Sequence, residues 1–370
     1  METARFHARL HTKAAATVPG SRCTAIRYGR ETIGIVTLAA LDVGAPEYFW
    51  QKVAKVPATG RTVSVDNVDG GPGAPSDAVG TGETDLDVEQ SGALAPGANV
   101  TVYQAPNSDP GFIDAFFAAA SQNTVGSVST SWGESETYVA SAVAAGQETA
   151  SYEAAFDEAF LEMADQCQSV FAAAGDAGAY DASRYLGSTN LSVDTPGDSP
   201  YLTSSGGTTL PWSGTLTGPD GSATVTVPTQ RAWDWDYLWA GDRDHHGRVV
   251  RDRGDVVRGR RRCGFSVVEP EPAYQKLVSG TADYHGVQYL AQTDYQSVVS
   301  GTNFIEPTAW GRHPDPAGRL RQRLWPRGAR PVREHRPGVG VGQPTFQSGW
   351  GGTSFVVSPQ FNGSTAVIES

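Results

Sequence analysis

Runs of apolar and β-branched residues recur through the first half of the chain at a spacing that suits the strands of one sheet. The continuous run TIGIVTLAA at 32–40 is typical of a strand buried on both faces. Further strands are predicted at 99–106 (NVTVYQAP), 126–133 (GSVSTSWG) and 169–175 (SVFAAAG). Between 203 and 234 the pattern changes to short polar alternations, which predict hairpins in a surface excursion.

Segments between these runs carry apolar residues at helical spacing. Residues 111–122 predict an amphipathic helix, and residues 151–166 predict a second one with Ser151 as its N-cap. A short helix is predicted after a cap at Thr81, ending before Pro96. Because strands and helices alternate, we predict an α/β protein with a parallel sheet flanked by helices and a site at the carboxyl ends of the strands. The apolar face of the first helix consists of Phe112, Ala115, Phe116 and Ala119.

The charge of the chain restricts its partners. The 370 residues carry a formal net charge of −12, which argues against nucleic acid because phosphate binding needs a basic surface. No apolar run reaches the ~18 residues of a membrane span. The first residues, METARFHARLHTKAAATVPG, lack the apolar core of an ordinary signal peptide. The three cysteines allow at most one disulfide, and we expect unpaired thiols without a catalytic role.

Two windows, 243–262 and 312–336, hold 16 of the 28 Lys and Arg residues. One interpretation is a basic binding surface or a pair of disordered insertions. The other is translation of a GC-rich gene in the wrong reading frame, which gives the same Arg, Pro and Gly composition. We hypothesise two frame-shifted segments, with the true frame restored near Gly264 and near 338–345. The coding DNA would decide between them.

Four carboxyl side chains lie within GETDLDVE, at the start of the short helix that begins near Glu83. At helical spacing Glu83 and Asp87 share one face, while Asp85 and Glu89 share another. The simple interpretation is a solvated acidic first turn, which the helix dipole favours. The functional interpretation is a coupled carboxyl pair in which one member holds a proton in moderately acid solution.

Two glycine-rich turns supply further candidates. GWGGTSFVVSP places Ser354 behind small residues, where backbone N–H groups can face a developing anion. FAAAGDAGAYD ends a predicted strand in Asp176. Each is also ordinary turn chemistry when taken alone. Among the seven histidines, His285 alone lies away from the Arg-rich windows and the N-terminus, so a His-based triad is disfavoured. A carboxylate base makes sense in acid, where His would be protonated.

Taken in order, four motifs resemble the sedolisin family of serine-carboxyl peptidases, acid-acting relatives of the subtilisin fold. TGETDLDVEQSGALAPGANVTVYQAP resembles the family's acidic pattern followed by APGA and Y-x-AP. SVSTSWGESE resembles its S-x-SWG-x-x-E stretch, AAAGDAG its AAxGDSG, and GGTSF its GGTSA. The resemblance covers most of 28–240, 264–276 and 345–357.

The resemblance implies a role for each matching residue. Ser354 would be the nucleophile and Glu83 the general base that accepts its proton, with Asp87 bonded to Glu83 and orienting it. Asp176 would be the oxyanion group, protonated in acid so that it donates a hydrogen bond to the tetrahedral intermediate. The substrate backbone would lie along an extended edge formed by Ser131, Trp132 and Gly133.

The resemblance also implies a subtilisin-like parallel sheet flanked by helices, with the two Arg-rich windows as irregular insertions. Residues 28–370 would form the peptidase domain and residues 1–27 a leader or pro-region remnant. The C-terminus would be truncated before the family's calcium segment, so calcium is expected from the family although its ligands are not present in this chain. We expect a secreted monomer that acts on protein or peptide substrates and binds neither nucleic acid nor membrane.

Two other classes of function stay open. A defective or truncated relative would keep the motifs without peptidase activity, because the Arg-rich windows replace the family's sequence before GFSVVEPEPAYQ and ahead of the nucleophile. Pro359 also follows Ser354 by five positions where the family usually has four. The third class is a binding module that uses the Arg-rich windows.

Overall fold

A parallel sheet is the centre of the computed structural model, which describes residues 31–57, 59–178, 181–182, 192–209, 211–218, 221–232, 266, 268–269, 272, 288–290 and 310–312. The sheet has six strands in the order β2-β3-β1-β4-β6-β8, and every neighbouring pair is parallel. Its strands are β1 (Thr32–Thr37), β2 (Val63–Asn67), β3 (Asn99–Gln104), β4 (Ser127–Thr130), β6 (Ser169–Ala173) and β8 (Thr203–Ser205).

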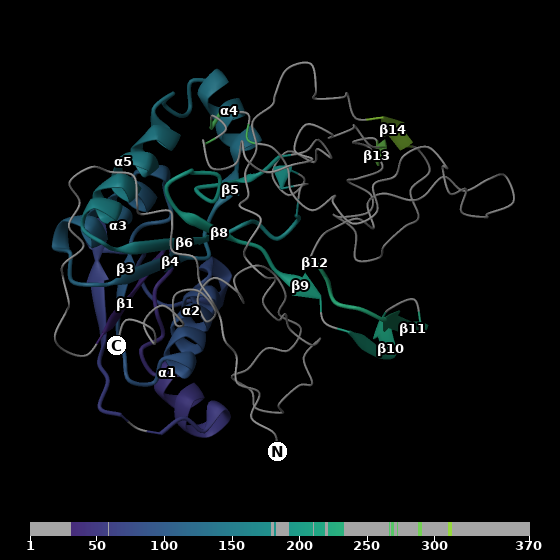
Figure 1. The fold of residues 1–370 in the computed structure, drawn as a ribbon, viewed down its shortest axis with the longest axis horizontal. Coiled ribbons are helices and arrows are strands. Elements are labelled where there is room, and N and C mark those ends of the chain that lie inside the picture. Colours follow the sequence, from purple (N-terminus) through teal and green to yellow (C-terminus); the bar gives the residue numbers. More distant parts are fainter. Residues whose placement is uncertain are drawn as a thin grey trace, which may run out of the picture.

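Helices cover both faces of this sheet (Figure 1). One face carries α1 and α2, and the other carries α3 and α5. The helices are α1 (Ala45–Tyr48), its π-helical continuation Phe49–Ala54, α2 (Thr81–Leu94), α3 (Asp109–Gln122), α4 (Glu136–Ala144) and α5 (Tyr152–Asp165), with short 3₁₀ turns at Val68–Gly70 and Asp77–Val79.

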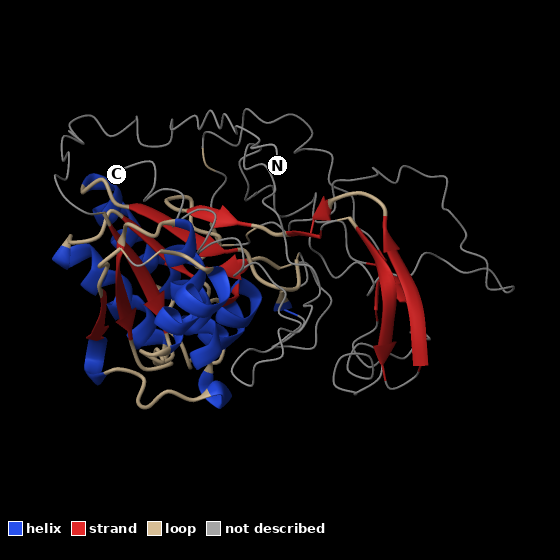
Figure 2. Cartoon of the chain, turned by 90° about the horizontal axis from the view of Figure 1, so that it is seen from below, coloured by secondary structure: helices blue, strands red, loops and turns tan. Residues whose placement is uncertain are grey.

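The remaining described strands form two-stranded antiparallel pairs. The longest pair is a hairpin that projects away from the helices and the main sheet (Figure 2). The predicted surface excursion over 203–234 is therefore confirmed for the hairpin, but it is wrong for residues 203–205, which form β8 of the central sheet. These pairs are β10 (Trp212–Gly218) with β11 (Gly221–Val227), β5 (Glu134–Ser135) with β7 (Asp194–Thr195), β9 (Thr208–Thr209) with β12 (Arg231–Ala232), and β13 (Gln288–Leu290) with β14 (Trp310–Arg312).

Alternation along β1 and β3 divides the core between the two faces. Ile33 and Ile35 pack with α2 and its neighbours, whereas Val36 packs with α3 and α5. In β3, Val102 faces the α2 side and Tyr103 the α3 side. Successive side chains of a strand point to opposite faces, so a continuous apolar run is what a sheet covered on both sides requires.

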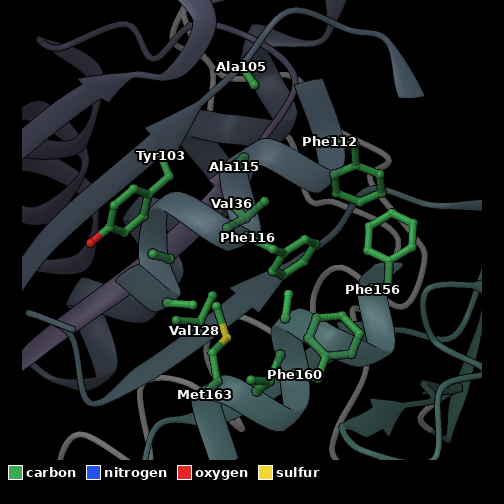
Figure 3. Packing of buried hydrophobic residues seen from close by; sticks show 14 of the residues in the cluster. Val36, Tyr103, Ala105, Phe112, Ala115, Phe116, Val128, Phe156, Phe160 and Met163 are labelled. Carbon is green, nitrogen blue, oxygen red and sulfur yellow. The ribbon is translucent and has the colours of Figure 1, made fainter. Parts of the chain in front are cut away.

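The core between α3, α5 and the sheet is built from aromatic rings (Figure 3). Phe116 is fully buried, with ring centroids of Phe156 at 5.8 Å and Phe160 at 5.0 Å, both approached edge to face. Phe112 closes the group at 5.4 Å from Phe116. Such contacts add to the free energy gained by burying the rings. The apolar face predicted for residues 111–122 is the one that meets this core.

The predicted α/β fold with a parallel sheet flanked by helices is confirmed. Two capping predictions need correction. Thr81 is the first residue of α2 and not its cap; its hydroxyl donates to the carbonyl oxygen of Ala40 at 2.8 Å and accepts from the N–H of Ser76 at 2.7 Å. Ser151 does stand at the N-cap of α5, but its side chain makes no capping hydrogen bond.

The cysteine prediction also needs correction. Cys167 was expected to be an unpaired thiol but is disulfide-bonded, with a partner outside the described residues. The two Arg-rich windows lie outside the described residues as well, apart from Arg312 in β14. In the part of the chain that is described, no helix combines the length and apolarity needed to span a membrane.

Truncation of Phe116 tests the aromatic core. Phe116→Ala is expected to lower the free energy of unfolding by about 3–5 kcal/mol, because it leaves a cavity among packed rings. Leu161→Ala is the control, since Leu161 lies on α5 with its side chain 40% exposed and should cost about 0.5 kcal/mol or less. Urea unfolding followed by circular dichroism measures both. Equal losses in the two variants would contradict this packing.

Candidate active site

The predicted site residues that the structure describes lie on α2 and at the carboxyl ends of two neighbouring strands. Glu83 and Asp87 are one turn apart on α2. Ser131–Gly133 follow β4 directly, and Asp176 lies in the turn after β6, which pairs with β4. The strand predicted at 126–133 thus ends earlier, at Thr130. Ser354 lies outside the described residues, so its placement stays a prediction.

A chain of hydrogen bonds fixes α2 against the end of β1. The indole N–H of Trp132 donates to Thr37 Oγ1 at 2.9 Å. Thr37 and Thr84 hydroxyl oxygens are 2.7 Å apart, and Thr84 Oγ1 donates to the carbonyl oxygen of Ala39 at 3.1 Å. Because the Thr84 proton is used in that bond, the Thr37 hydroxyl donates to Thr84. Each donor in the chain polarises the next, which strengthens a buried network.

Gly80, just before α2, leaves the space that the Trp132 side chain occupies. Its φ of 100° lies in the left-handed region that a residue with a Cβ rarely adopts. A Cβ on Gly80 would also lie 2.7 Å from the indole ring of Trp132. The ring therefore packs directly on the backbone at the start of the helix that carries Glu83.

The second half of α2 is held by Trp50 and Arg61. The indole N–H of Trp50 donates to the carbonyl oxygen of Glu89 at 2.7 Å. The Arg61 guanidinium lies 3.6 Å above the Trp50 ring and donates to the carbonyl oxygen of Gly92. A Cβ at Gly92 would collide with the Trp50 ring. Both ends of the helix are therefore fixed, so the orientation of its carboxyl side chains is set by the fold.

Asp87 is the most buried of the predicted catalytic carboxyls. Its side chain is 0% exposed, and its Oδ1 accepts a hydrogen bond of 2.7 Å from the Ser131 hydroxyl. Glu83, one turn earlier, is partly exposed. This gradient places the proposed base toward solvent and its partner in the interior, an arrangement that a solvated acidic turn would not produce.

The simple interpretation of a solvated acidic turn is wrong for Glu89, which lies on the other face of α2, whereas Asp85 beside it is partly exposed. Glu89 is 8% exposed, and burial, followed by the charge of Asp85, raises its pKa to about 8. Burial also raises the pKa of Asp85 to about 7, although its Oδ1 accepts the N–H of Asp42 at 2.9 Å. Asp77 and Asp42 add repulsion there. These groups are neutral in acid solution.

The turn that holds Asp176 brings further carboxyl groups together. Gly175 has φ of 81°, and a Cβ there would lie 2.6 Å from Asp181 Oδ1 and 3.2 Å from Asp194 Cβ. Asp194 is buried, and burial, followed by the charge of Asp181 and a hydrogen bond with it, raises its pKa well above the ordinary value. Asp176 itself adds to that repulsion. Asp176 thus lies in an acidic neighbourhood that the sequence alone did not reveal.

A second group of buried acids lies beside β5 and α5. Glu136 is 0% exposed and accepts from the Ser266 hydroxyl at 2.8 Å. Burial, followed by the charge of Glu136, raises the pKa of Glu153 to about 8. Burial raises the pKa of Asp198 well above the ordinary value. The sequence analysis missed these residues; Glu136, as the last residue of SWGESE, carried the one usable signal.

Gly133 allows the extended segment after β4 to approach β7. A Cβ at Gly133 would collide with the Asp194 carboxylate and lie 2.8 Å from the carbonyl oxygen of Thr195. Ser131, Trp132 and Gly133 are each partly exposed. Residues 131–133 therefore pack against Asp194 and Thr195 and are also partly accessible to solvent. As to metals, the described residues contain no group of three or more His, Cys, Asp or Glu side chains that could hold an ion.

Comparisons with known proteins place these features in context. No family model matches the chain. Kumamolisin from Bacillus sp. (strain MN-32) is 38% identical over 196 residues, which are 50% of this chain and 31% of that protein. Sedolisin from Pseudomonas sp. (strain 101) is 28% identical over 257 residues, 68% of this chain and 38% of that protein. The chain therefore spans about a third of the length of these curated relatives.

Solved structures were matched as well. One of them is Pseudomonas sedolisin, described as a serine-carboxyl proteinase complexed with two molecules of pseudo-iodotyrostatin. The match has a TM-score of 0.43 and 25% identity, and covers 68% of this chain and 61% of that one.

Replacing Glu89 by Gln tests the buried face of α2. The folded state holds a proton on Glu89 that the unfolded chain releases above about pH 4.5. The resulting stability is present in full below that pH and is lost as the pH rises through about 8. Glu89→Gln should remove this loss, a gain on the order of a few kcal/mol at pH 8 relative to the native chain.

Urea unfolding between pH 4.5 and pH 8 measures that gain. Glu158→Gln is the matched control, because Glu158 is exposed on α5 and its replacement should leave the pH dependence unchanged. Parallel curves for Glu89→Gln and the native chain would show that Glu89 is ionised in the folded state.

Proposed function

We propose that this chain is a serine-carboxyl peptidase of the sedolisin family that hydrolyses peptide bonds in acid solution. One observation carries the proposal. Asp87 is completely buried and bonded to Ser131, one helical turn from the partly exposed Glu83, at the carboxyl end of β4. This is the arrangement that a proton-handling carboxyl pair needs, with one member accessible and the other fixed.

The proposed reaction begins at Ser354. Glu83 takes the proton from Ser354 Oγ as the oxygen attacks the carbonyl carbon of the peptide bond. Asp87 holds the Glu83 carboxyl in the orientation that receives the proton. Glu83 then passes this proton to the leaving amine, which gives an acyl-enzyme on Ser354. A water molecule, deprotonated by Glu83, hydrolyses the ester and frees the enzyme.

Asp176 would stabilise the negative oxygen of the tetrahedral intermediate. A neutral carboxyl group can donate a hydrogen bond, whereas a carboxylate would repel the oxyanion. The turn that holds Asp176 brings the Asp181 and Asp194 carboxyl groups close to Gly175, which is the geometry that supports a site of carboxyl chemistry there. The substrate backbone would lie along the partly exposed segment Ser131–Gly133.

We further propose protein or peptide substrates, secretion and a monomeric state, as the resemblance implies. Calcium is expected from the family, but no step of the reaction above uses it, and the described residues offer no group of ligands for it. The Arg-rich windows have no role in the proposed reaction.

Peptidase activity should depend on Ser354, Glu83 and acid. At about pH 4, Ser354→Ala and Glu83→Gln are expected to lower the rate of casein digestion by about a thousandfold or more, because each removes a group that acts in the transition state. Activity of the native chain should fall toward neutral pH, because the role proposed for Asp176 requires a carboxyl group that donates a hydrogen bond. Release of acid-soluble peptides is the measurement.

Glu158→Gln, which alters an exposed carboxyl on α5, is the control and should digest casein at the native rate. Circular dichroism must show that every variant is folded. A folded native chain with no more activity than Ser354→Ala would instead identify a catalytically defective relative. An optimum at neutral or alkaline pH would contradict the roles given to Glu83 and Asp176.

A further inference from the structure

We infer that Ser131 is a positioning residue, whose hydroxyl holds Asp87 in the orientation and charge state that make Glu83 an effective base. The inference rests on the proposed function and goes beyond a role for Ser131 in the substrate-binding edge. It is carried by one contact, the hydrogen bond from Ser131 Oγ to Asp87 Oδ1 at 2.7 Å.

The donor of this bond is fixed by the centre of the sheet. Ser131 is the first residue after β4, whose last residue, Thr130, is in register with Val36 of β1 on one side and Ala172 of β6 on the other. Trp132, the next residue, is tied to Thr37 by its indole N–H. Ser131 therefore lies between two anchored positions, and its hydroxyl presents a donor with little freedom.

The acceptor, the Asp87 carboxyl group, is also fixed, and it is shielded from solvent. Asp87 is 0% exposed, so water cannot take the place of a lost donor without entering the interior. Thr84, three residues earlier on α2, bonds to Thr37 and to Ala39. These bonds fix α2 against the end of β1. The Ser131 hydroxyl, which follows β4, adds a bond from the sheet to the carboxyl group of Asp87.

The chemical consequence follows from the direction of the bond. A hydroxyl that donates to a carboxyl group favours its ionised form. The bond therefore stabilises negative charge on Asp87, and that charge increases the affinity of neighbouring Glu83 for the proton of the nucleophile. The proton moves from Ser354 Oγ to Glu83, and no bond forms or breaks at Ser131.

Other charged groups on and around α2 are placed differently. Glu83 shares the Asp87 face, while Asp85 and Glu89 lie on the other. Asp42, after β1, and Asp77, before α2, act on Asp85. Arg61 bonds to the carbonyl oxygen of Gly92. The Ser131 hydroxyl is therefore a donor to Asp87 that can be removed without altering any of these charges.

Replacing Ser131 by Ala tests the inference through kinetics. For Ser131→Ala we expect kcat to fall about 10- to 100-fold with KM nearly unchanged, because the side-chain hydrogen bond to Asp87 is lost while the backbone of Ser131–Gly133, along which the substrate would lie, is kept. The acid limb of the kcat profile should move to higher pH by about one unit, since ionised Asp87 is less stable without the donor. Ser131→Thr, which keeps a hydroxyl, should restore both.

If Ser131 acted in substrate binding alone, its replacement by Ala would change KM and leave kcat nearly unchanged. In Ser131→Ala the KM would then rise while the acid limb of the kcat profile stayed at the native pH. The pH profile of Ser131→Thr would not differ from that of Ser131→Ala. That result would overturn the inference. Thermal unfolding monitored by circular dichroism checks that the variants retain their fold.

A second measurement needs no activity and separates this inference from the proposed function. Carbon-13 NMR of labelled Asp carboxyl groups, recorded between pH 2.5 and pH 7 with Asp87→Asn to assign the signal, follows the titration of Asp87 directly. A midpoint that rises in Ser131→Ala supports the inference, even in a chain that digests nothing. An unchanged midpoint overturns it, whatever the peptidase assay shows.

Discussion

The hydrogen-bond chain from Trp132 through Thr37 to Thr84 is the contact on which the rest of the site depends. It joins the end of β1, the segment after β4 and the first turns of α2, and all three hydroxyl and indole groups find partners inside the protein. An unsatisfied group in this position would cost about 1–3 kcal/mol, so the network tolerates one arrangement of helix and sheet. That arrangement places Glu83 and Asp87 at the carboxyl edge, where parallel sheets carry their chemistry.

Buried carboxyl groups are the second constraint, and they link the fold to the pH of the proposed reaction. Glu89, Glu153 and Asp194 have raised pKa values because they are buried, and other carboxyl groups add to the effect. In acid these groups are neutral and act as ordinary polar side chains. As they ionise, both the interior and the turn that holds Asp176 take on unfavourable charge. Stability and the proposed chemistry therefore favour the same conditions, for the same physical reason.

The spacing of apolar residues and the order of the motifs predicted much of the fold and of the candidate site from the sequence. The central strands and the helices α3 and α5 follow from local apolar spacing, and the motifs placed Glu83, Asp87, Ser131 and Asp176 near neighbouring strand ends. Asp85 and Glu89 could not be judged in this way, because an acidic first turn is solvated unless another element packs against it. Here Asp42 bonds to Asp85, and Trp50 bonds to the backbone of the buried Glu89. The approach of Asp181 and Asp194 to the Asp176 turn arises from long-range packing through Gly175 and β7, which leaves no local pattern. The hydrogen bond from Ser131 to Asp87 joins residues 44 positions apart, and no local pattern predicts it; the place of Ser131 in a substrate edge stays a prediction.

The central claim is that a carboxyl pair on α2 activates Ser354 in acid, and trapping the acyl-enzyme tests it most directly. An activated peptide ester is mixed with the chain at about pH 4, the reaction is quenched within milliseconds to seconds, and peptide mass spectrometry locates any acyl group. The account predicts an acyl group on Ser354 in the native chain, formed far more slowly in Glu83→Gln. A folded native chain that is never acylated at Ser354, or is acylated equally fast without the Glu83 carboxylate, would contradict it.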